Sequence, residues 1–217
     1  MASTLWRTSP TIPNRDQLIH AELHQPVNAG GLVLFCHGSG SNRFSPRNLH
    51  VADQLERAGL ATLLIDLEQA GERTSERPLT TLTRQQERLL SVIDWTTEQP
   101  GLQRLPLGLF GSSSGAAVAL VGAAERSELV QAVVCRGGRP DLVFQRLTEV
   151  RCPVLLLVGE HDLDVLELNA WAAGQFQVRH ELVVIPAAGH LFSEPGSLDA
   201  VAEQAQAWFT AQFRQTR

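Results

Sequence analysis

The stretch LPLGLFGSSSGAAVALVGAA, residues 105–124, places the five residues GSSSG between an apolar run and an alanine-rich run. The apolar run predicts a strand over 105–110, and the alanine-rich run predicts a helix over 114–124. Glycines two residues before and two residues after Ser113 permit the sharp turn that a GxSxG motif makes between a strand and a helix. The helix would direct its unpaired N–H groups at the same place. The pattern therefore predicts that Ser113 lies at the end of a strand as a candidate nucleophile.

The rest of the chain repeats this alternation of short apolar runs and longer segments with helical spacing. Strands are expected over 17–23, 31–35, 60–65, 105–110, 129–135, 153–158 and 181–185, and helices over 46–58, 79–98, 114–124, 165–174 and 198–213. Continuous apolar strands are typical of a parallel sheet with both faces covered, because a strand exposed on one face would alternate polar and apolar residues. The predicted fold class is α/β, a three-layer α/β/α sandwich with a mostly parallel central sheet and no large cap domain. No repeat or linker divides the sequence, so residues 1–217 are predicted to form a single domain.

The composition excludes several classes of enzyme and partner. All 18 basic residues are arginines, and without lysine the chain cannot form a Schiff base or a GxxxxGK[ST] phosphate loop. A net charge of -5 provides no basic surface for a nucleic acid or an anionic membrane. The N-terminal segment lacks the apolar stretch of a signal peptide, and three cysteines do not indicate a disulfide framework. These features favour a cytoplasmic protein that acts on a small molecule, with no nucleic-acid or membrane partner.

A serine hydroxyl needs a base to become a good nucleophile, and His190 is the candidate for that base. It follows the predicted strand 181–185 in the segment AAGHLF, where small residues leave room for an imidazole. Parallel strands present their carboxyl ends along one edge, so the segments FCHGSGS, FGSSSGA, GEHD and AAGH are expected to converge there. The other six histidines are interpreted as surface or structural residues: His20, His24, His37, His50, His161 and His180.

The base in turn needs a carboxylate that holds its tautomer and stabilises its charged form. Asp162 comes directly after the predicted strand 153–158, between the nucleophile and the base in chain order. Asp164 and Glu160 remain alternatives, because each is only two residues away from Asp162.

Two backbone N–H groups are expected to bind the oxyanion of a tetrahedral intermediate. One is the N–H of Ser114 at the start of the predicted helix, and the other is that of Ser39 in HGSGSN, residues 37–42. Gly38 or Gly40 would serve as well on sequence grounds. No group of histidines, cysteines or carboxylates has the spacing of a zinc site, so neither a metal nor a cofactor is predicted.

Two further features bear on access and substrate. The polar segment 68–78, EQAGERTSERP, could form a mobile loop over the sheet edge, or it could be an ordinary solvated connection. Four arginines fall near strand ends, where a guanidinium could pair with a carboxylate on an acidic substrate: Arg43, Arg47, Arg136 and Arg139. At each of these positions an arginine is more often an ordinary surface residue, and the folded position decides between the two interpretations.

The motifs HGSGS, GSSSG, GEHD and GH, in this order, resemble the α/β-hydrolase superfamily, and the small size without a large cap is most similar to its dienelactone-hydrolase-like branch. The resemblance covers nearly the whole chain. It implies Ser113 as the nucleophile, Asp162 as the acid, His190 as the histidine and residues 37–40 as the oxyanion loop. Dienelactone hydrolases have a cysteine where this chain has Ser113, so the resemblance implies a serine esterase or thioesterase. Some similar small bacterial hydrolases are joined to a phosphoribosyltransferase domain, which is not expected in this sequence.

The expected reaction is hydrolysis of a carboxylic ester or thioester through an acyl-enzyme on Ser113, with His190 as base and Asp162 as orienting acid. The expected partner is a small-molecule ester or thioester, and a homodimer stays open. Two alternatives also stay open: a binding or receptor protein of this fold without turnover, and a peptidase or acyltransferase.

Overall fold

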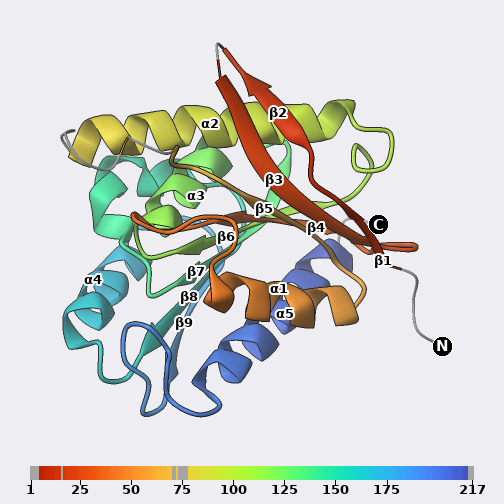
Figure 1. Ribbon diagram of the computed structural model, residues 1–217. Helices are drawn as coiled ribbons and strands as arrows, with labels where there is room; N and C mark the ends of the chain where they lie inside the picture. Colours follow the sequence, from red (N-terminus) through yellow and green to blue (C-terminus); the bar gives the residue numbers. More distant parts are fainter. Residues whose placement is uncertain (1–4, 16, 70–71, 73–77, 215–217) are drawn as a thin grey trace.

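The computed structural model describes residues 5–15, 17–69, 72 and 78–214. Within these residues the strands form one twisted sheet in the order β1-β3-β5-β4-β6-β7-β8-β9, and β2 pairs with β3 off this path (Figure 1). The strands are β1 (Leu5–Thr8), β2 (Thr11–Asn14), β3 (Gln17–Pro26), β4 (Leu32–Cys36), β5 (Ala61–Ile65), β6 (Leu107–Ser112), β7 (Val130–Arg136), β8 (Val154–Gly159) and β9 (His180–Ile185). The helices are α1 (Pro46–Arg57), α2 (Pro78–Glu98), α3 (Ser114–Glu125), α4 (Leu163–Ala173) and α5 (Ser197–Arg214), with a 3-10 segment, η2 (Pro140–Glu149), after β7.

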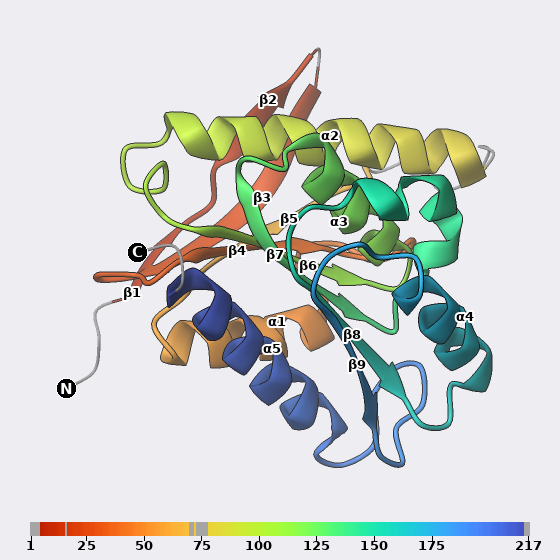
Figure 2. The same ribbon diagram turned by 180° about the vertical axis from the view of Figure 1, so that it is seen from behind.

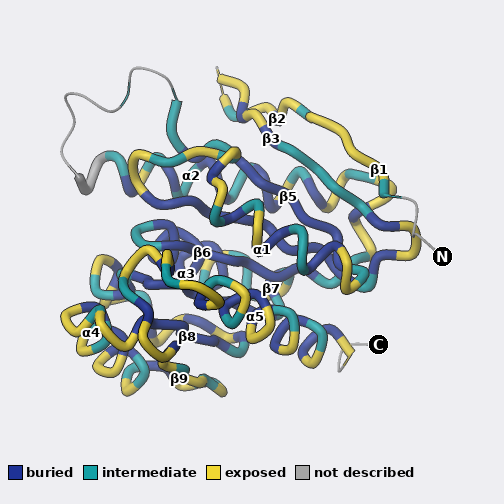
Figure 3. Tube along the Cα trace, turned by 60° about the horizontal axis from the view of Figure 1, so that its bottom comes forward, coloured by how far each residue is buried: buried dark blue, intermediate teal, exposed yellow. Residues whose placement is uncertain are grey.

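Helices cover both faces of the sheet, as Figures 1 and 2 show, with α2 and α3 on one face and α1 and α5 on the other. In β4, alternate side chains belong to different buried clusters: Leu32 and Leu34 lie in the cluster with α2 and α3, and Val33 and Phe35 lie in the cluster with α1 and α5. Because successive residues of a strand point to opposite faces, a fully apolar strand is buried on both sides. The central strands are accordingly buried in Figure 3. The predicted three-layer α/β/α architecture is confirmed.

The parallel strands bring the candidate residues to one edge of the sheet. β5, β4, β6, β7, β8 and β9 pair in parallel. At their carboxyl ends Cys36 is paired with Gly111, and Ser112 is paired with Arg136. The segments that follow β4, β6, β8 and β9 therefore leave the sheet beside one another, as the sequence predicted.

The expected strands and helices are present, with boundaries shifted by at most three residues. The sequence analysis missed β1, β2 and η2. The two missed strands are four residues long and largely exposed, and both pair with β3 in antiparallel fashion. Their apolar pattern is too short to detect, because this pairing rather than burial defines them. None of the helices in the described part of the chain is long and apolar enough to cross a membrane.

Helix α5 packs closely on the sheet because two glycines lie beneath it, one in β6 and one directly before β4. A Cβ atom added to Gly108 of β6 would lie 2.5 Å from the Phe209 ring, and one added to Gly31 would overlap the Phe213 ring. Both aromatic side chains are buried, and the two rings stack at 5.7 Å between centroids. Glycine is therefore required at these positions by close packing rather than by backbone conformation.

We expect Gly108→Ala to lower the free energy of unfolding by about 1–3 kcal/mol, because the added methyl group overpacks a rigid aromatic contact. Gly101→Ala is the matched control, since a Cβ there would lie 3.5 Å from Gln25 Oε1, at an ordinary contact distance. Urea denaturation of the two variants measures the difference. Equal stability of both variants would contradict the packing argument.

Candidate active site

Ser113 occupies a sharp turn between β6 and α3. Its backbone has φ 52° and ψ -126°, in a region that residues with a Cβ atom seldom adopt. The turn is held from both sides: the Ser113 N–H donates to Arg136 O at 3.1 Å, and Ser113 O accepts from the N–H groups of Ala116 and Arg139, each at 3.1 Å. The neighbouring strand thus fixes the strained backbone, as expected of a nucleophile on a strand-to-helix turn.

The two glycines of the motif are required by the packing of α3. A Cβ on Gly111 would lie 2.5 Å from the Cα of Ala116, and a Cβ on Gly115 would lie 2.5 Å from the carbonyl oxygen of His37. Real Cβ atoms do not come this close to backbone atoms, so side chains at either position would push α3 away from the sheet. The sequence analysis expected these glycines for the turn, and the structure adds that they let α3 contact the end of β4.

His190 and Asp162 form a hydrogen-bonded pair at the same edge. His190 Nδ1 donates to Asp162 Oδ2 at 2.6 Å, which leaves Nε2 available to accept a proton. The carboxylate side chain is 14% exposed and the imidazole 41% exposed, so the acid is covered while the base reaches solvent. Asp162 is the N-terminal flanking residue of α4 and its N–H donates to Gly159 O, which fixes its position after β8.

The two alternative acids lie elsewhere. Glu160 Oε2 accepts from the N–H of Ala187 at 2.7 Å and so braces the segment that leads to His190. Asp164 lies in the first turn of α4. Among these three described carboxylates, Asp162 is the one that contacts His190.

Ser113 and His190 line one cavity of about 200 Å³. Its other walls are Gly38, Ser39, Ser41, Ser45, Arg47, Ser112, Arg136 and Leu191. No hydrogen bond between Ser113 and His190 is present among the described residues, and catalytic hydrogen bonds are often long before a substrate binds. The cavity therefore places a candidate nucleophile and a candidate base around a space that a small molecule can enter.

Of the two backbone donors predicted for the oxyanion, Ser39 lines this cavity, and its N–H already has a hydrogen-bond partner. The N–H of Ser39 donates to Ser114 Oγ at 2.9 Å, and the two serine hydroxyls are 3.0 Å apart. The N–H of Gly40, an alternative donor, donates to Glu68 Oε2 at 3.2 Å. The Ser114 N–H belongs to the first turn of α3, where helical geometry provides no partner. For Ser39 to bind an oxyanion, the Ser114 hydroxyl has to rotate away.

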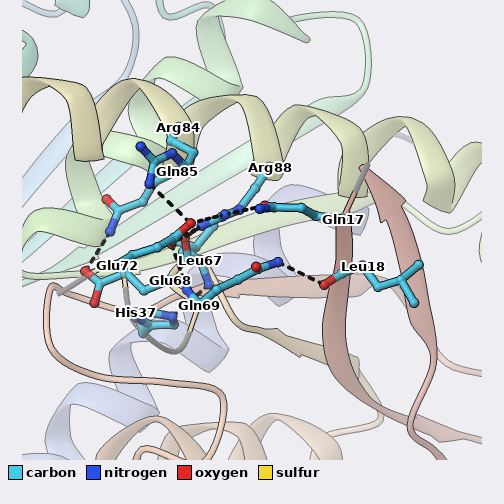
Figure 4. A network of polar contacts seen from close by, with 10 residues as sticks. All are labelled: Gln17, Leu18, His37, Leu67, Glu68, Gln69, Glu72, Arg84, Gln85 and Arg88. Carbon is cyan, nitrogen blue, oxygen red and sulfur yellow. Dashed lines mark hydrogen bonds and ion pairs between the residues drawn. The ribbon is translucent and has the colours of Figure 1, made fainter. Parts of the chain in front are cut away.

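Buried His37 connects the oxyanion loop to the segment after β5 (Figure 4). Its Nε2 accepts from the N–H of Leu67 at 2.8 Å, so Nδ1 carries the proton and donates to Gly38 O at 2.9 Å. A Cβ on Gly38 would come within 3.1 Å of the Ser113 Cβ. This histidine therefore has a structural role beside the nucleophile, as the sequence analysis interpreted it.

Arg88, a buried arginine of α2, binds the segment that follows β5 (Figure 4). Arg88 is 1% exposed and donates to Leu67 O at 2.8 Å and to both carboxylate oxygens of Glu72, at 2.6 and 2.7 Å. These bonds lower the pKa of Glu72 from 4.5 to about 2. Glu68 is held in turn by Gln85 at 2.9 Å. The hypothesis of a mobile loop over 68–78 rests largely on residues 70–71 and 73–77, which lie outside the described residues.

The remaining polar residues separate into structural and cavity-facing groups. Cys36, Cys135 and Cys152 are free and buried, and burial raises the pKa of each thiol, so none is a ready nucleophile. No group of three potential metal ligands occurs in the part of the chain that the structure describes.

Four further residues are paired in the structure: His24 with Glu56, His50 with Asp199, Arg43 with Asp66, and Arg139 with Asp141. Arg47 and Arg136 instead line the cavity beside Ser113.

Replacing Glu72 should destabilise the protein in a pH-dependent way. A lowered pKa means that the carboxylate adds stability above pH 4.5, and this contribution falls as the pH drops toward about 2. Glu72→Gln should therefore cost at most about 3 kcal/mol at pH 7, and less at pH 3.5. Denaturant melts at both pH values measure this. The control is Glu87→Gln, which removes an exposed pair with Arg15 and should change little at either pH. A cost for Glu72→Gln that does not fall with pH would contradict the assignment.

Comparisons with known proteins agree with this fold. A family described as an alpha/beta hydrolase domain matches residues 29–215. Two curated proteins, from two strains of Mycobacterium tuberculosis and provisionally named phosphoribosyl transferase, are 45% identical over 191 residues. That match covers 88% of this chain but 43% of the relatives, so the chain spans less than half of their length.

Among solved structures, a dienelactone hydrolase from Anabaena variabilis is 45% identical, with a TM-score of 0.92 over 96% of this chain and 98% of that chain. The protein Est1E from Butyrivibrio proteoclasticus shares the fold at 18% identity, with a TM-score of 0.81 over 95% of this chain and 99% of that chain. These matches support a hydrolase. The chain belongs to the alpha/beta hydrolase domain family and is a dienelactone-hydrolase-like member of it.

Proposed function

We propose that this protein is a serine hydrolase that cleaves a carboxylic ester or thioester through an acyl-enzyme on Ser113. The observation that carries the proposal is the His190–Asp162 pair at 2.6 Å on the rim of the cavity where Ser113 sits on its strained turn. A nucleophile, a base and an acid that orients the base are the groups that acyl transfer needs. The likeness to a dienelactone hydrolase at 45% identity supports the reaction class.

The first half of the reaction forms the acyl-enzyme. Ser113 Oγ attacks the carbonyl carbon while its proton moves to His190 Nε2, and Asp162 stabilises the resulting imidazolium. The oxyanion would be bound by the N–H of Ser114 and, once the Ser114 hydroxyl rotates, by the N–H of Ser39. Collapse of the tetrahedral intermediate breaks the bond to the alcohol or thiol, which leaves with the proton from His190.

The second half releases the acid. A water molecule gives a proton to His190 Nε2 as its oxygen attacks the acyl carbon, and the same backbone donors bind the second oxyanion. When that intermediate collapses, His190 returns the proton to Ser113 Oγ and the carboxylic acid leaves. His190 thus acts first as base and then as acid in each half.

The provisional transferase name of the curated relatives refers to proteins more than twice as long as the shared segment. The hydrolase family model matches 29–215 of this chain, so the proposal concerns this segment alone.

Ser113→Ala should abolish covalent labelling by a fluorophosphonate probe, because the probe reacts with an activated serine hydroxyl. The wild-type protein should be labelled at Ser113, as peptide mapping after digestion would show. Ser91→Ala is the matched control, since Ser91 lies on α2 away from the cavity and should leave labelling unchanged. Labelling at another residue, or no labelling of folded wild-type protein, would refute the proposed nucleophile.

Asp162→Asn should lower kcat for ester hydrolysis by about 10³–10⁴-fold, because the amide favours the wrong imidazole tautomer. Asp164→Asn tests the neighbouring carboxylate and should keep kcat within about twofold, since Asp164 does not contact His190. Steady-state kinetics with a 4-nitrophenyl ester measure both variants. The reverse order of effects would assign the acid to Asp164 and remove Asp162 from the mechanism.

A further inference from the structure

Arg136 is a buried cation beside the candidate nucleophile. It ends β7, its backbone carbonyl accepts the Ser113 N–H at 3.1 Å, and its side chain lines the cavity that holds Ser113 and His190. The residue is 7% exposed. Its guanidinium lies 6.0 Å from the centroid of the Phe110 ring, at the outer limit of a cation–π contact. This one contact does not compensate for the hydration that the guanidinium loses when it is buried.

A second arginine faces the same cavity. Arg47 lies in the first turn of α1, and like Arg136 it lines the space next to Ser113. Arg47 Nε and Arg136 Nη1 are both buried without a hydrogen-bond partner. Among the described residues no carboxylate forms an ion pair with either arginine, whereas the buried Arg88 is paired with Glu72.

This arrangement of two cations is unfavourable on its own. Burial and the charge of Arg47 together lower the pKa of Arg136 to about 10. An unpaired buried cation costs free energy, and a second cation nearby increases that cost. The side chain of Ser45, which precedes α1, lines the same cavity without capping the helix, so the positive end of α1 also faces this region. An anion bound there would satisfy all of these groups at once.

We propose that Arg47 and Arg136 form a subsite for an anionic group, a carboxylate or a phosphate, carried by the substrate close to the bond that Ser113 attacks. This proposal rests on the proposed function and adds its substrate class. Guanidinium groups bind carboxylate and phosphate oxygens through paired charge-assisted hydrogen bonds, which fits two arginines with unused donors.

The dimensions of the site limit where the anion lies. The cavity of about 200 Å³ is smaller than the roughly 300–1,000 Å³ of most ligand pockets, so the anion and the reacting carbonyl are separated by only a few atoms. A second cavity of about 320 Å³ shares Arg47 and Leu191 with the first, but Glu194 and Asp199 also line it. Those two carboxylates would repel an anion, so we place the anionic group in the first cavity.

The test compares two esters that differ in charge at one end. The anionic substrate is the 4-nitrophenyl half-ester of glutaric acid, and the neutral one is the same compound with its free carboxylate methylated. Rates are corrected with Ser113→Ala, because a nearby carboxylate speeds spontaneous hydrolysis. The wild-type protein should favour the anionic ester by about 10- to 100-fold in kcat/KM, as expected for hydrogen bonds to a charged group.

Arg47→Met and Arg136→Met should each remove most of this preference, measured as the ratio of kcat/KM for the anionic ester to kcat/KM for the neutral ester. Turnover of the neutral ester also shows that each variant is folded. Arg57→Met is the control, because Arg57 lies on the same helix and pairs with Asp53 at the surface. If Arg136→Met does not fold, Arg47→Met alone decides the outcome. No charge preference in the wild type, or a preference that Arg47→Met leaves unchanged, would overturn the subsite.

The phosphonate analogue, the 4-nitrophenyl ester of 3-phosphonopropionic acid, distinguishes the two kinds of anion. A higher kcat/KM for this ester identifies a phosphate-type group, and a higher value for the glutarate half-ester identifies a carboxylate. Either order supports the subsite.

Binding without turnover separates this proposal from the proposed function. Calorimetric titration of Ser113→Ala with glutarate monomethyl ester should show binding that Arg47→Met weakens by about tenfold. If no ester is hydrolysed but this binding is seen, the subsite stands and the hydrolase proposal fails. If the neutral ester is hydrolysed but the anion does not bind, the subsite is wrong and the hydrolase proposal stands.

Discussion

The close contact between α3 and the end of β4 is the constraint on which the site depends. Gly115 allows the helix to approach the carbonyl oxygen of His37, and Ser113, directly before this helix, has a backbone conformation with positive φ. Hydrogen bonds with Arg136, Arg139 and Ala116 hold this turn, so the surrounding structure keeps its strained backbone in place. The candidate nucleophile is thus placed by packing of the core, and His190 lines the same cavity because the strand before it ends at the same edge of the sheet.

Polar groups near this edge are buried in two different ways. Arg88 Nη1 and Nη2 donate to Glu72 and to the backbone of Leu67, while its buried Nε has no partner among the described residues. These bonds join α2 to the segment after β5 and, through His37, to the loop over 37–42. Arg47 and Arg136 lack such partners and face the cavity. Removing one partner of a buried ion pair is costly, whereas a buried charge without a partner calls for an explanation, such as a ligand that completes it. The contrast separates the framework of the site from its binding surface.

Most of the fold and the position of Ser113 could be predicted from the sequence, because apolar runs and the GSSSG motif indicate the strands, the helices and their order. The sequence favoured Asp162 as the partner of His190 but left Asp164 and Glu160 open, because a shift of two residues at a helix start turns a side chain away; the structure pairs Asp162 with His190. The short strands β1 and β2 were missed because pairing with β3 defines them. The burial of Arg136 could not be predicted either, because an arginine at the end of a strand gives the same sequence pattern whether its side chain is exposed or buried.

The central claim is that Ser113 carries an acyl group during turnover. The most direct measurement is intact-protein mass spectrometry after mixing the protein with a 4-nitrophenyl ester and quenching in acid within milliseconds to seconds. The account predicts a mass increase equal to the acyl group, located on the peptide that contains Ser113 and absent from Ser113→Ala. Hydrolysis of the ester with no covalent intermediate, or with the acyl group on another residue, would contradict it.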